Sequence, residues 1–275
     1  MSDLHTHTVY SDGRDTPEEM VLSAIEKGLE EIGISDHSYT DFDTSWCMKR
    51  EDIQRYKAEI NRLKTKYAGK ISVKCGVEQD YRSAESTEGF DYVIGSVHYV
   101  RVKKTASAPT GESTGMYGNS GTAVYIPTVE NPEISEMEVY IPVDESTEIL
   151  EAAAEKYFGG DIYALCEVYF ETLSDVVDRT GCDIIGHFDL ISKFTEKSGL
   201  IDTENPRYIA AWKKAADMLL EKNVPFEINY GAISRGYRTG PYPAEPIYLY
   251  LKDRGAEFVY SSDAHQKENV GFRFF

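Results

Sequence analysis

Cysteine is scarce in this sequence, and its four cysteines form no metal-binding or redox motif. No two of them make a C-x-x-C pair, and Cys75 and Cys182 lie in apolar runs, where cysteine is typically a small core residue. We therefore expect reduced thiols, as in cytosolic proteins, rather than a disulfide framework.

Long hydrophobic runs are also absent. No segment approaches the roughly 18 apolar residues of a membrane span, and no basic-then-apolar leader opens the chain. We expect a cytoplasmic protein that does not contact a membrane.

Basic residues are few relative to acidic ones: 29 Lys and Arg against 47 Asp and Glu give a formal net charge of −18. Such a surface repels nucleic-acid phosphates and anionic membranes. A small anionic substrate remains compatible with it, because bound cations can reverse the charge locally. We therefore expect no nucleic-acid partner.

The sequence does contain an alternation of short β-branched runs and longer helical patterns. About seven runs are typical of strands, and most of them precede a helix: DLHTH, EEIGISDH, KISVKCGVE, FDYVIGSVH, CDIIGHFD, VPFEINY and AEFVYSSDAH. Alternating β and α elements favour a parallel sheet with helices outside it. The length of 275 residues fits one irregular α/β barrel domain over 1–275. A doubly wound open sheet is the alternative.

Capping residues and glycines predict where the helices begin and end. Thr16 caps the first helix, Pro17 occupies its first turn, and Gly28 ends it. Further helices are expected over about 51–67, 146–158, 161–180, 206–223 and 244–254.

One segment, at about 103–138, interrupts the alternation. It is rich in Gly, Ser, Thr and Pro, and it is too long for an ordinary connection between two elements. We predict an irregular insertion that forms a lid or a hairpin.

Histidine is scarce too, and every histidine lies at or just beyond a strand-like run. A single buried histidine usually only satisfies a hydrogen bond, but scattered core histidines would not all be expected at strand ends. In an α/β barrel the carboxyl ends of the strands form the active-site face. The pattern therefore predicts a metal site at that face, built from His5, His7, His37, His98, His187 and His265.

Two carboxylates follow the same rule, and a third lies near the first histidines. Glu78 ends one strand-like run, Asp263 lies two residues before His265, and Asp12 follows the first histidine pair. Imidazole and carboxylate ligands suit Zn, Mn and Fe(II). This is too large a ligand set for one ion, so we predict two or three divalent ions, which would activate water and clamp a phosphoryl group. Asp12 lies in a Ser-Asp-Gly stretch, where a role in forming a turn is an equal alternative.

The sequence resembles the polymerase and histidinol phosphatase (PHP) family of metal-dependent phosphoesterases. The resemblance rests on HTHTVYSDG, ISDH, GVE, GSVH, GHFD and SSDAH, which occur in the family's order across nearly the whole chain. Within the family, GSVHYV, YIPVD, GHFDLISKF, FEINYG and SSDAHQKENVG are most similar to the monofunctional histidinol-phosphate phosphatases.

This resemblance implies a distorted seven-stranded (βα) barrel, a trinuclear metal site, and hydrolysis of L-histidinol phosphate in histidine biosynthesis. A metal-bridging hydroxide would attack phosphorus, which makes Glu78, Asp263 and His265 the expected catalytic residues. The implied ligands are His5, His7, Glu78 and Asp263 for one ion, Glu78 with His98 and His187 for a second, and Asp12, His37 and His265 for the third.

A phosphate monoester also attracts cationic side chains. Arg235 and Arg238 follow the FEINY strand, and Lys193 follows GHFDLIS, so all three are near the expected mouth of the barrel. We expect at least one of the two arginines to bind the phosphate, and solvated surface cations are the alternative for each.

Three other functions are open. The same site could act on another phosphomonoester or on a nucleotide. A PHP-like domain without catalysis, used only for binding, is less consistent with a complete ligand set. Amide hydrolysis in a metal-dependent barrel fits the Glu78 and GSVH pair less well. The sequence carries no signal for an oligomeric state.

Overall fold

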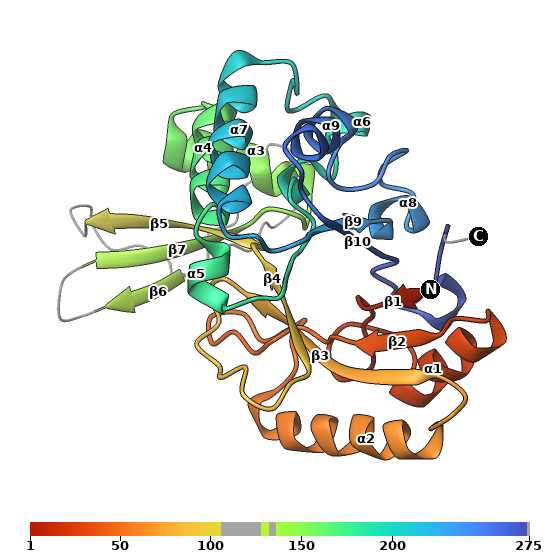
Figure 1. Ribbon diagram of the computed structural model, residues 1–275. Coiled ribbons are helices and arrows are strands. Elements are labelled where there is room, and N and C mark those ends of the chain that lie inside the picture. Colours follow the sequence, from red (N-terminus) through yellow and green to blue (C-terminus); the bar gives the residue numbers. More distant parts are fainter. Residues whose placement is uncertain (106–127, 132–135, 274–275) are drawn as a thin grey trace.

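The computed structural model describes residues 1–105, 128–131 and 136–273 of the chain (Figure 1). Seven strands form one sheet in the order β1-β2-β3-β4-β8-β9-β10, and all paired neighbours run parallel. The strands are β1 (Ser2–Asp3), β2 (Glu31–Ile34), β3 (Ser72–Asp80), β4 (Tyr92–Ser96), β8 (Ile184–Ile185), β9 (Phe226–Asn229) and β10 (Phe258–Ser261).

The first and last strands of this sheet meet beyond their carboxyl ends. Thr6 forms a parallel bridge with Ala264. The amide of His7 donates to the carbonyl of Ala264 at 2.8 Å, and the amide of Ala264 donates to the carbonyl of His5 at 3.3 Å. The sheet is therefore nearly closed into a barrel. The predicted distorted barrel is confirmed, and the open doubly wound alternative is wrong.

Helices cover the outside of the barrel. Figure 1 shows α1 and α2 below the sheet, and α3, α4 and α7 above it. The longer helices are α1 (Pro17–Glu26), α2 (Ile53–Lys66), α3 (Thr147–Phe158), α4 (Ile162–Leu173), α5 (Val176–Thr180), α7 (Pro206–Leu220) and α9 (Glu245–Asp253). Short helical turns are α6 (Thr195–Ser198), α8 (Gly231–Ser234), η1 (Arg50–Asp52), η2 (Leu190–Ser192) and η3 (Lys267–Asn269).

The predicted helix over 161–180 is wrong in one respect, because α4 and α5 are separate. The hydroxyl of Ser174 donates to the carbonyl of Glu171 at 2.7 Å. Serine side chains that bond nearby backbone groups compete with a helix in this way. The chain turns at Ser174 before α5 begins.

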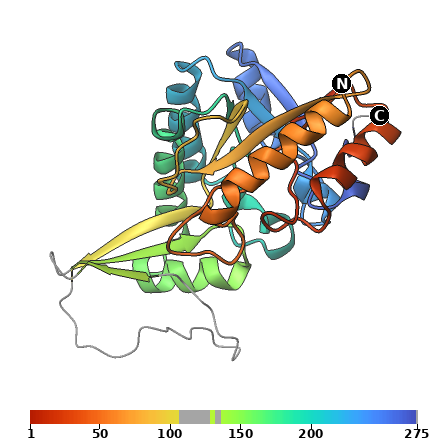
Figure 2. The same cartoon turned by 90° about the horizontal axis from the view of Figure 1, so that it is seen from below.

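The predicted irregular insertion at about 103–138 is ordered where the structure describes it. A second sheet runs in the order β5-β7-β6 with antiparallel pairing, from β5 (Tyr99–Thr105), β6 (Thr128–Asn131) and β7 (Glu136–Pro142). These strands extend away from the barrel (Figure 2). Val100, Val139 and Ile141 are fully buried and join the main hydrophobic core. Residues 106–127 and 132–135 of the predicted insertion lie outside the described residues.

Within the described ranges, none of the helices combines the length and the apolar character needed to cross a bilayer.

Tyr56 of α2 is buried and connects two neighbouring strands of the barrel. Its side chain is fully buried, and its hydroxyl lies 2.6 Å from the carbonyl of Ile34 in β2 and 2.9 Å from that of Gly76 in β3. The two strands lead to His37 and Glu78 respectively. This hydroxyl therefore helps to set the relative positions of two predicted ligands.

We expect Tyr56→Phe to lower the free energy of unfolding by about 1–3 kcal/mol, because it leaves buried carbonyls without their donor. Urea unfolding followed by circular dichroism measures the change. Tyr260→Phe is the control, since Tyr260 is half exposed. Equal effects of the two substitutions would contradict the role given to Tyr56.

Candidate active site

The nine predicted ligands converge at the carboxyl ends of the strands. His5 and His7 follow β1, His37 follows β2, Glu78 lies in β3, His98 follows β4, His187 follows β8, and Asp263 and His265 follow β10. Asp12 comes from the loop between β1 and α1. The structure thus brings together residues from both ends of the sequence at one mouth of the barrel.

Glu78 is the centre of this group. Its side chain is fully buried, and imidazoles from five histidines surround it. Burial alone would raise the pKa of Glu78, but the imidazoles, His37 first, hold it well below its usual range. From Oε2 the distances are 3.2 Å to His5 Nε2, 3.5 Å to His7 Nε2 and 2.8 Å to His37 Nδ1; from Oε1 they are 2.9 Å to His187 Nε2 and 3.4 Å to His98 Nε2.

Asp263 is a second carboxylate in contact with the imidazoles. Its Oδ1 lies 3.4 Å from His7 Nε2 and 3.4 Å from His265 Nδ1. Its backbone has a φ of 49°, in the left-handed region. A Cβ on Gly231 would lie 2.5 Å from Asp263 Oδ2, so this close approach requires glycine at position 231.

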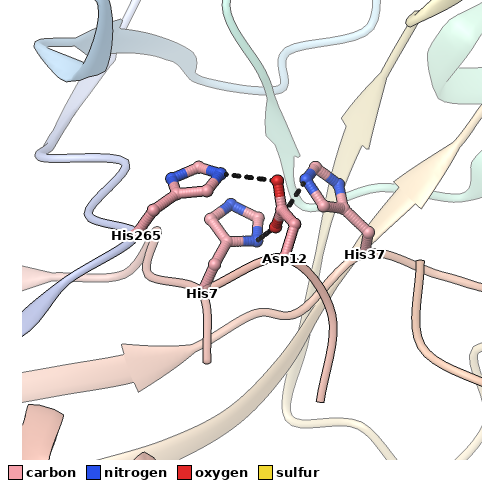
Figure 3. Close-up of side chains that lie close together, drawn as sticks. All are labelled: His7, Asp12, His37 and His265. Atoms are coloured by element: carbon pink, nitrogen blue, oxygen red, sulfur yellow. Dashed lines mark ion pairs between the residues drawn. The ribbon is translucent and has the colours of Figure 1, made fainter. Parts of the chain in front are cut away.

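Asp12 lies among three imidazoles (Figure 3). Its carboxylate is 3.1 Å from His265 Nε2, 3.6 Å from His37 Nε2 and 3.9 Å from His7 Nδ1. Its backbone also lies in a turn, so the two alternatives for this residue are compatible. The carboxylate, which is one-third exposed, completes a group of four potential ligands.

The donor atoms fit divalent ions. Three groups have ligand atoms within 4.8 Å of one another: His7, Asp12, His37 and His265; His5, His7 and Asp263; and His37, Glu78 and His98. Several of these buried atoms have no hydrogen-bond partner, including His5 Nε2 and both ring nitrogens of His7. Burial, followed by the neighbouring His37 and His265, lowers the pKa of His7 to about 3, which leaves its ring neutral with a lone pair to donate. Buried orphan nitrogens are rare unless a ligand satisfies them.

Two carboxylates behind the histidines are absent from the sequence prediction. Glu227 Oε1 lies 2.5 Å from His5 Nδ1, and Asp80 Oδ2 lies 3.1 Å from His98 Nδ1. Burial would lower the pKa of His98, but Glu78 and Asp80 raise it to about 9. The sequence did hold a signal: Glu227 interrupts the apolar run VPFEINY, and Asp80 shares a strand face with Glu78.

The three predicted phosphate-binding cations lie in different surroundings. Arg235 lines the cavity at the mouth, and its guanidinium lies 3.0 Å from Asp263 Oδ2 and 2.7 Å from His265 Nδ1. Lys193 also lines the cavity, where its Nζ lies 3.1 Å from Asp144. Arg238 is not among the lining residues. It is 8% exposed, and its guanidinium donates to Asp189.

The cavity has a volume of about 690 Å³ and extends beyond the histidines. Trp46 forms one wall: its ring centroid lies 4.5 Å from that of His37, 5.2 Å from that of His98 and 5.9 Å from that of Tyr99. The hydroxyl of Tyr99 donates to Asp43 Oδ2 at 2.8 Å. Asp43 and Glu145 also line this end. One cavity therefore joins the candidate metal centre to an end bearing aromatic rings and carboxylates.

Two curated relatives are similar over nearly the whole of this chain. A protein of Deinococcus radiodurans named "Probable histidinol-phosphatase" is 30% identical over 295 residues, covering 100% of this chain and 90% of the relative. The histidinol-phosphatase of Bacillus subtilis is 24% identical over 297 residues, covering 99% and 96%.

Solved structures show the same fold. HisK of Listeria monocytogenes superposes with a TM-score of 0.74 at 20% identity, covering 100% of this chain and 98% of that one. Histidinol phosphate phosphatase of Lactococcus lactis, solved with zinc, L-histidinol and phosphate, gives 0.61 at 20% identity, covering 97% and 86%. The sequence profile of the PHP domain matches residues 3–231. The chain therefore belongs to the PHP domain family.

Proposed function

We propose that this protein is a metal-dependent phosphatase that hydrolyses L-histidinol phosphate to L-histidinol and phosphate. The observation that carries the proposal is the cluster of buried imidazoles and carboxylates with unpartnered donor atoms beside Arg235, in one cavity. The names of the relatives support the choice of substrate, as does the solved relative with L-histidinol and phosphate.

Two or three divalent ions, zinc, manganese or iron, would be held by the nine residues that the sequence predicts. The three groups with close donor atoms support more than one ion, and Glu78 is placed to bridge because both of its oxygens face imidazoles. When bound, such ions lower the pKa of water and stabilise the charge on a phosphoryl group. Glu78, Asp263 and His265 remain the proposed catalytic residues, because all three line the same cavity as Arg235, which contacts the last two.

Arg235 is the proposed phosphate-binding arginine. It faces the cavity with about a quarter of its side chain exposed, and Asp263 and His265 fix its guanidinium next to the metal groups. Arg238 is held by Asp189 and by Ser192, both 3.2 Å away and both buried. We assign Arg238 a structural role. Lys193 is the proposed second cation near the phosphate, although Asp144 partly neutralises it.

The far end of the cavity fits a cationic group. Within the described ranges, no lysine or arginine forms an ion pair with Asp43 or Glu145. Partial burial, followed by the nearby carboxylates of Asp144 and Asp43, raises the pKa of Glu145, and Lys193 opposes this shift. L-Histidinol phosphate carries its imidazole at the end opposite its phosphate, whereas its ammonium group lies on the carbon next to the phosphate-bearing one. An imidazole donates N–H hydrogen bonds and is cationic when protonated. A nucleotide would instead place further phosphates or an uncharged base in this region.

The test of the proposed function is phosphate release by metal-free protein reloaded with zinc, manganese or iron. We expect kcat/KM for L-histidinol phosphate to exceed that for an aryl phosphate whose ring carries no charge by about a hundredfold, equivalent to about 2.7 kcal/mol of transition-state binding. An aryl phosphodiester and a mononucleotide are the comparison substrates. A higher kcat/KM for the mononucleotide would replace the proposed substrate, and no release from any ester by any loaded form would end the phosphatase proposal.

Arg235→Met and Arg238→Met test whether each arginine binds the phosphate or stabilises the fold. Arg235→Met should reduce kcat/KM for every phosphomonoester by about a hundredfold, because it removes a charge-assisted contact worth roughly 1.5–3 kcal/mol. Arg238→Met should instead lower the free energy of unfolding by about 3–5 kcal/mol, because it leaves the buried Asp189 carboxylate unpaired. Steady-state kinetics and urea unfolding on both variants decide the matter, and a reversal of the two phenotypes would exchange the assigned roles.

Asp43→Asn tests whether Asp43 recognises the imidazole end of the substrate. We expect kcat/KM for L-histidinol phosphate to fall about tenfold, since one charge-assisted hydrogen bond from the substrate's imidazole, worth roughly 1.4 kcal/mol, is lost. Hydrolysis of an aryl phosphate whose ring carries no charge should be unchanged. Asp178→Asn is the matched control, because Asp178 pairs with Lys222 on the outer surface. A parallel loss on both substrates would place Asp43 outside substrate selection.

A further inference from the structure

Glu227 is a buried carboxylate that does not line the cavity. It lies in β9, is 1% exposed, and accepts hydrogen bonds from four groups. Its Oε1 lies 2.5 Å from His5 Nδ1 and accepts from the hydroxyl of Ser261. Its Oε2 accepts from the amide of His187 at 2.8 Å and from Asn229 Nδ2 at 3.0 Å. One side chain therefore connects β1, β9, β10 and the segment after β8.

These contacts fix the ring of His5. A carboxylate can only accept, so the Nδ1 of His5 must carry the proton that it donates. The other ring nitrogen, Nε2, points at Glu78 Oε2 at 3.2 Å and has no hydrogen-bond partner. His5 is fully buried, so no solvent competes for either nitrogen.

The same carboxylate reaches two more potential ligands indirectly. Its bond to the amide of His187 sets the backbone of that residue. Asn229, oriented because its Oδ1 accepts from the amide of Gly231 at 2.8 Å, donates to Asp263 Oδ2 at 3.2 Å as well as to Glu227.

We propose that Glu227 is a positioning residue for the metal centre, which directs the Nε2 lone pair of His5 to the ion and aligns His187 and Asp263 around it. The inference rests on the metal site of the proposed function. Partners behind metal-binding histidines commonly orient the ring and alter metal affinity by about 10–100-fold.

Glutamine at position 227 could not accept all the hydrogen bonds that Glu227 accepts. Its amide nitrogen must replace either Oε1, where it would face His5 Nδ1–H, or Oε2, where it would face the two donors His187 N–H and Asn229 Nδ2. In the first arrangement His5 has to accept at Nδ1 and carry its proton on Nε2, which removes the lone pair that faces the centre. In the second, two N–H groups lose their acceptor.

The experiment measures zinc binding to Glu227→Gln and to the wild type by competition with a chromogenic chelator, without substrate. We expect the tightest dissociation constant to rise about 10–100-fold in Glu227→Gln. Ser261→Ala is the matched control: it removes a donor from the same carboxylate but leaves the contact with His5, and we expect affinity close to that of the wild type. Unchanged zinc affinity in a folded Glu227→Gln variant would overturn the proposal.

A second measurement needs no variant. Long-range ¹H–¹⁵N correlation spectra of the zinc-loaded wild type should show His5 with a protonated, exchange-protected Nδ1 and an unprotonated Nε2, assigned through contacts of that proton with Ser261. A His5 ring protonated on Nε2 would overturn the proposal even if Glu227→Gln does not fold. Because neither measurement involves phosphate release, both can fail while the phosphatase proposal stands, and the reverse is equally possible.

Discussion

The structure depends on burying one carboxylate, Glu78, among five imidazoles. A carboxylate removed from water is strongly destabilising unless it is compensated, and here the compensation comes from residues that follow four different strands. The strands must therefore end at one common point. The bridge between His37 and Glu78 and the bridge between Thr6 and Ala264 fix the register at the two places where a shift would separate these groups.

Ionisable side chains form two layers at the mouth of the barrel. Imidazoles and Glu78 face the centre, and Glu227 and Asp80 lie behind two of the imidazoles, on the outer ring nitrogens of His5 and His98. This order gives each of these rings one nitrogen bound to protein and one directed at the centre. Because carboxylates and orphan ring nitrogens are both unfavourable when buried without partners, the arrangement favours cations at its centre over an empty, uncompensated pocket.

Much of the fold and of the candidate site was predictable, because short apolar runs that end in histidine indicate strands meeting at one barrel mouth. For the insertion, the sequence predicted a lid or a hairpin but not the strands β5, β6 and β7, since their apolar residues Val100, Val139 and Ile141 flank a long polar stretch. The roles of Glu227 and Asp80 depend on which ring nitrogen each faces, and pairing between distant strands decides that. Arg235 and Arg238 are only three residues apart. Their different surroundings arise from the path of the loop, which the pattern of residues in the sequence does not predict. The single-domain assignment, the cytoplasmic location and the ligand assignments stay predictions.

The net charge of −18 disfavours a phosphate substrate only if the charge is averaged over the whole molecule. The cavity lining carries charges of both signs. Arg235 contacts His265 among the imidazoles, whereas Asp43 accepts a hydrogen bond from Tyr99, whose ring lies beside Trp46. Screening in water acts over about 8–10 Å at moderate ionic strength, so a bound molecule experiences this local pattern more than the overall charge. A ligand with a phosphate at one end and an imidazole at the other suits both Arg235 and Asp43, whereas a polyanion would be attracted by the first and repelled by the second. Carboxylates in the lining such as Asp43, rather than the overall charge, therefore disfavour phosphate esters that carry a second negative group.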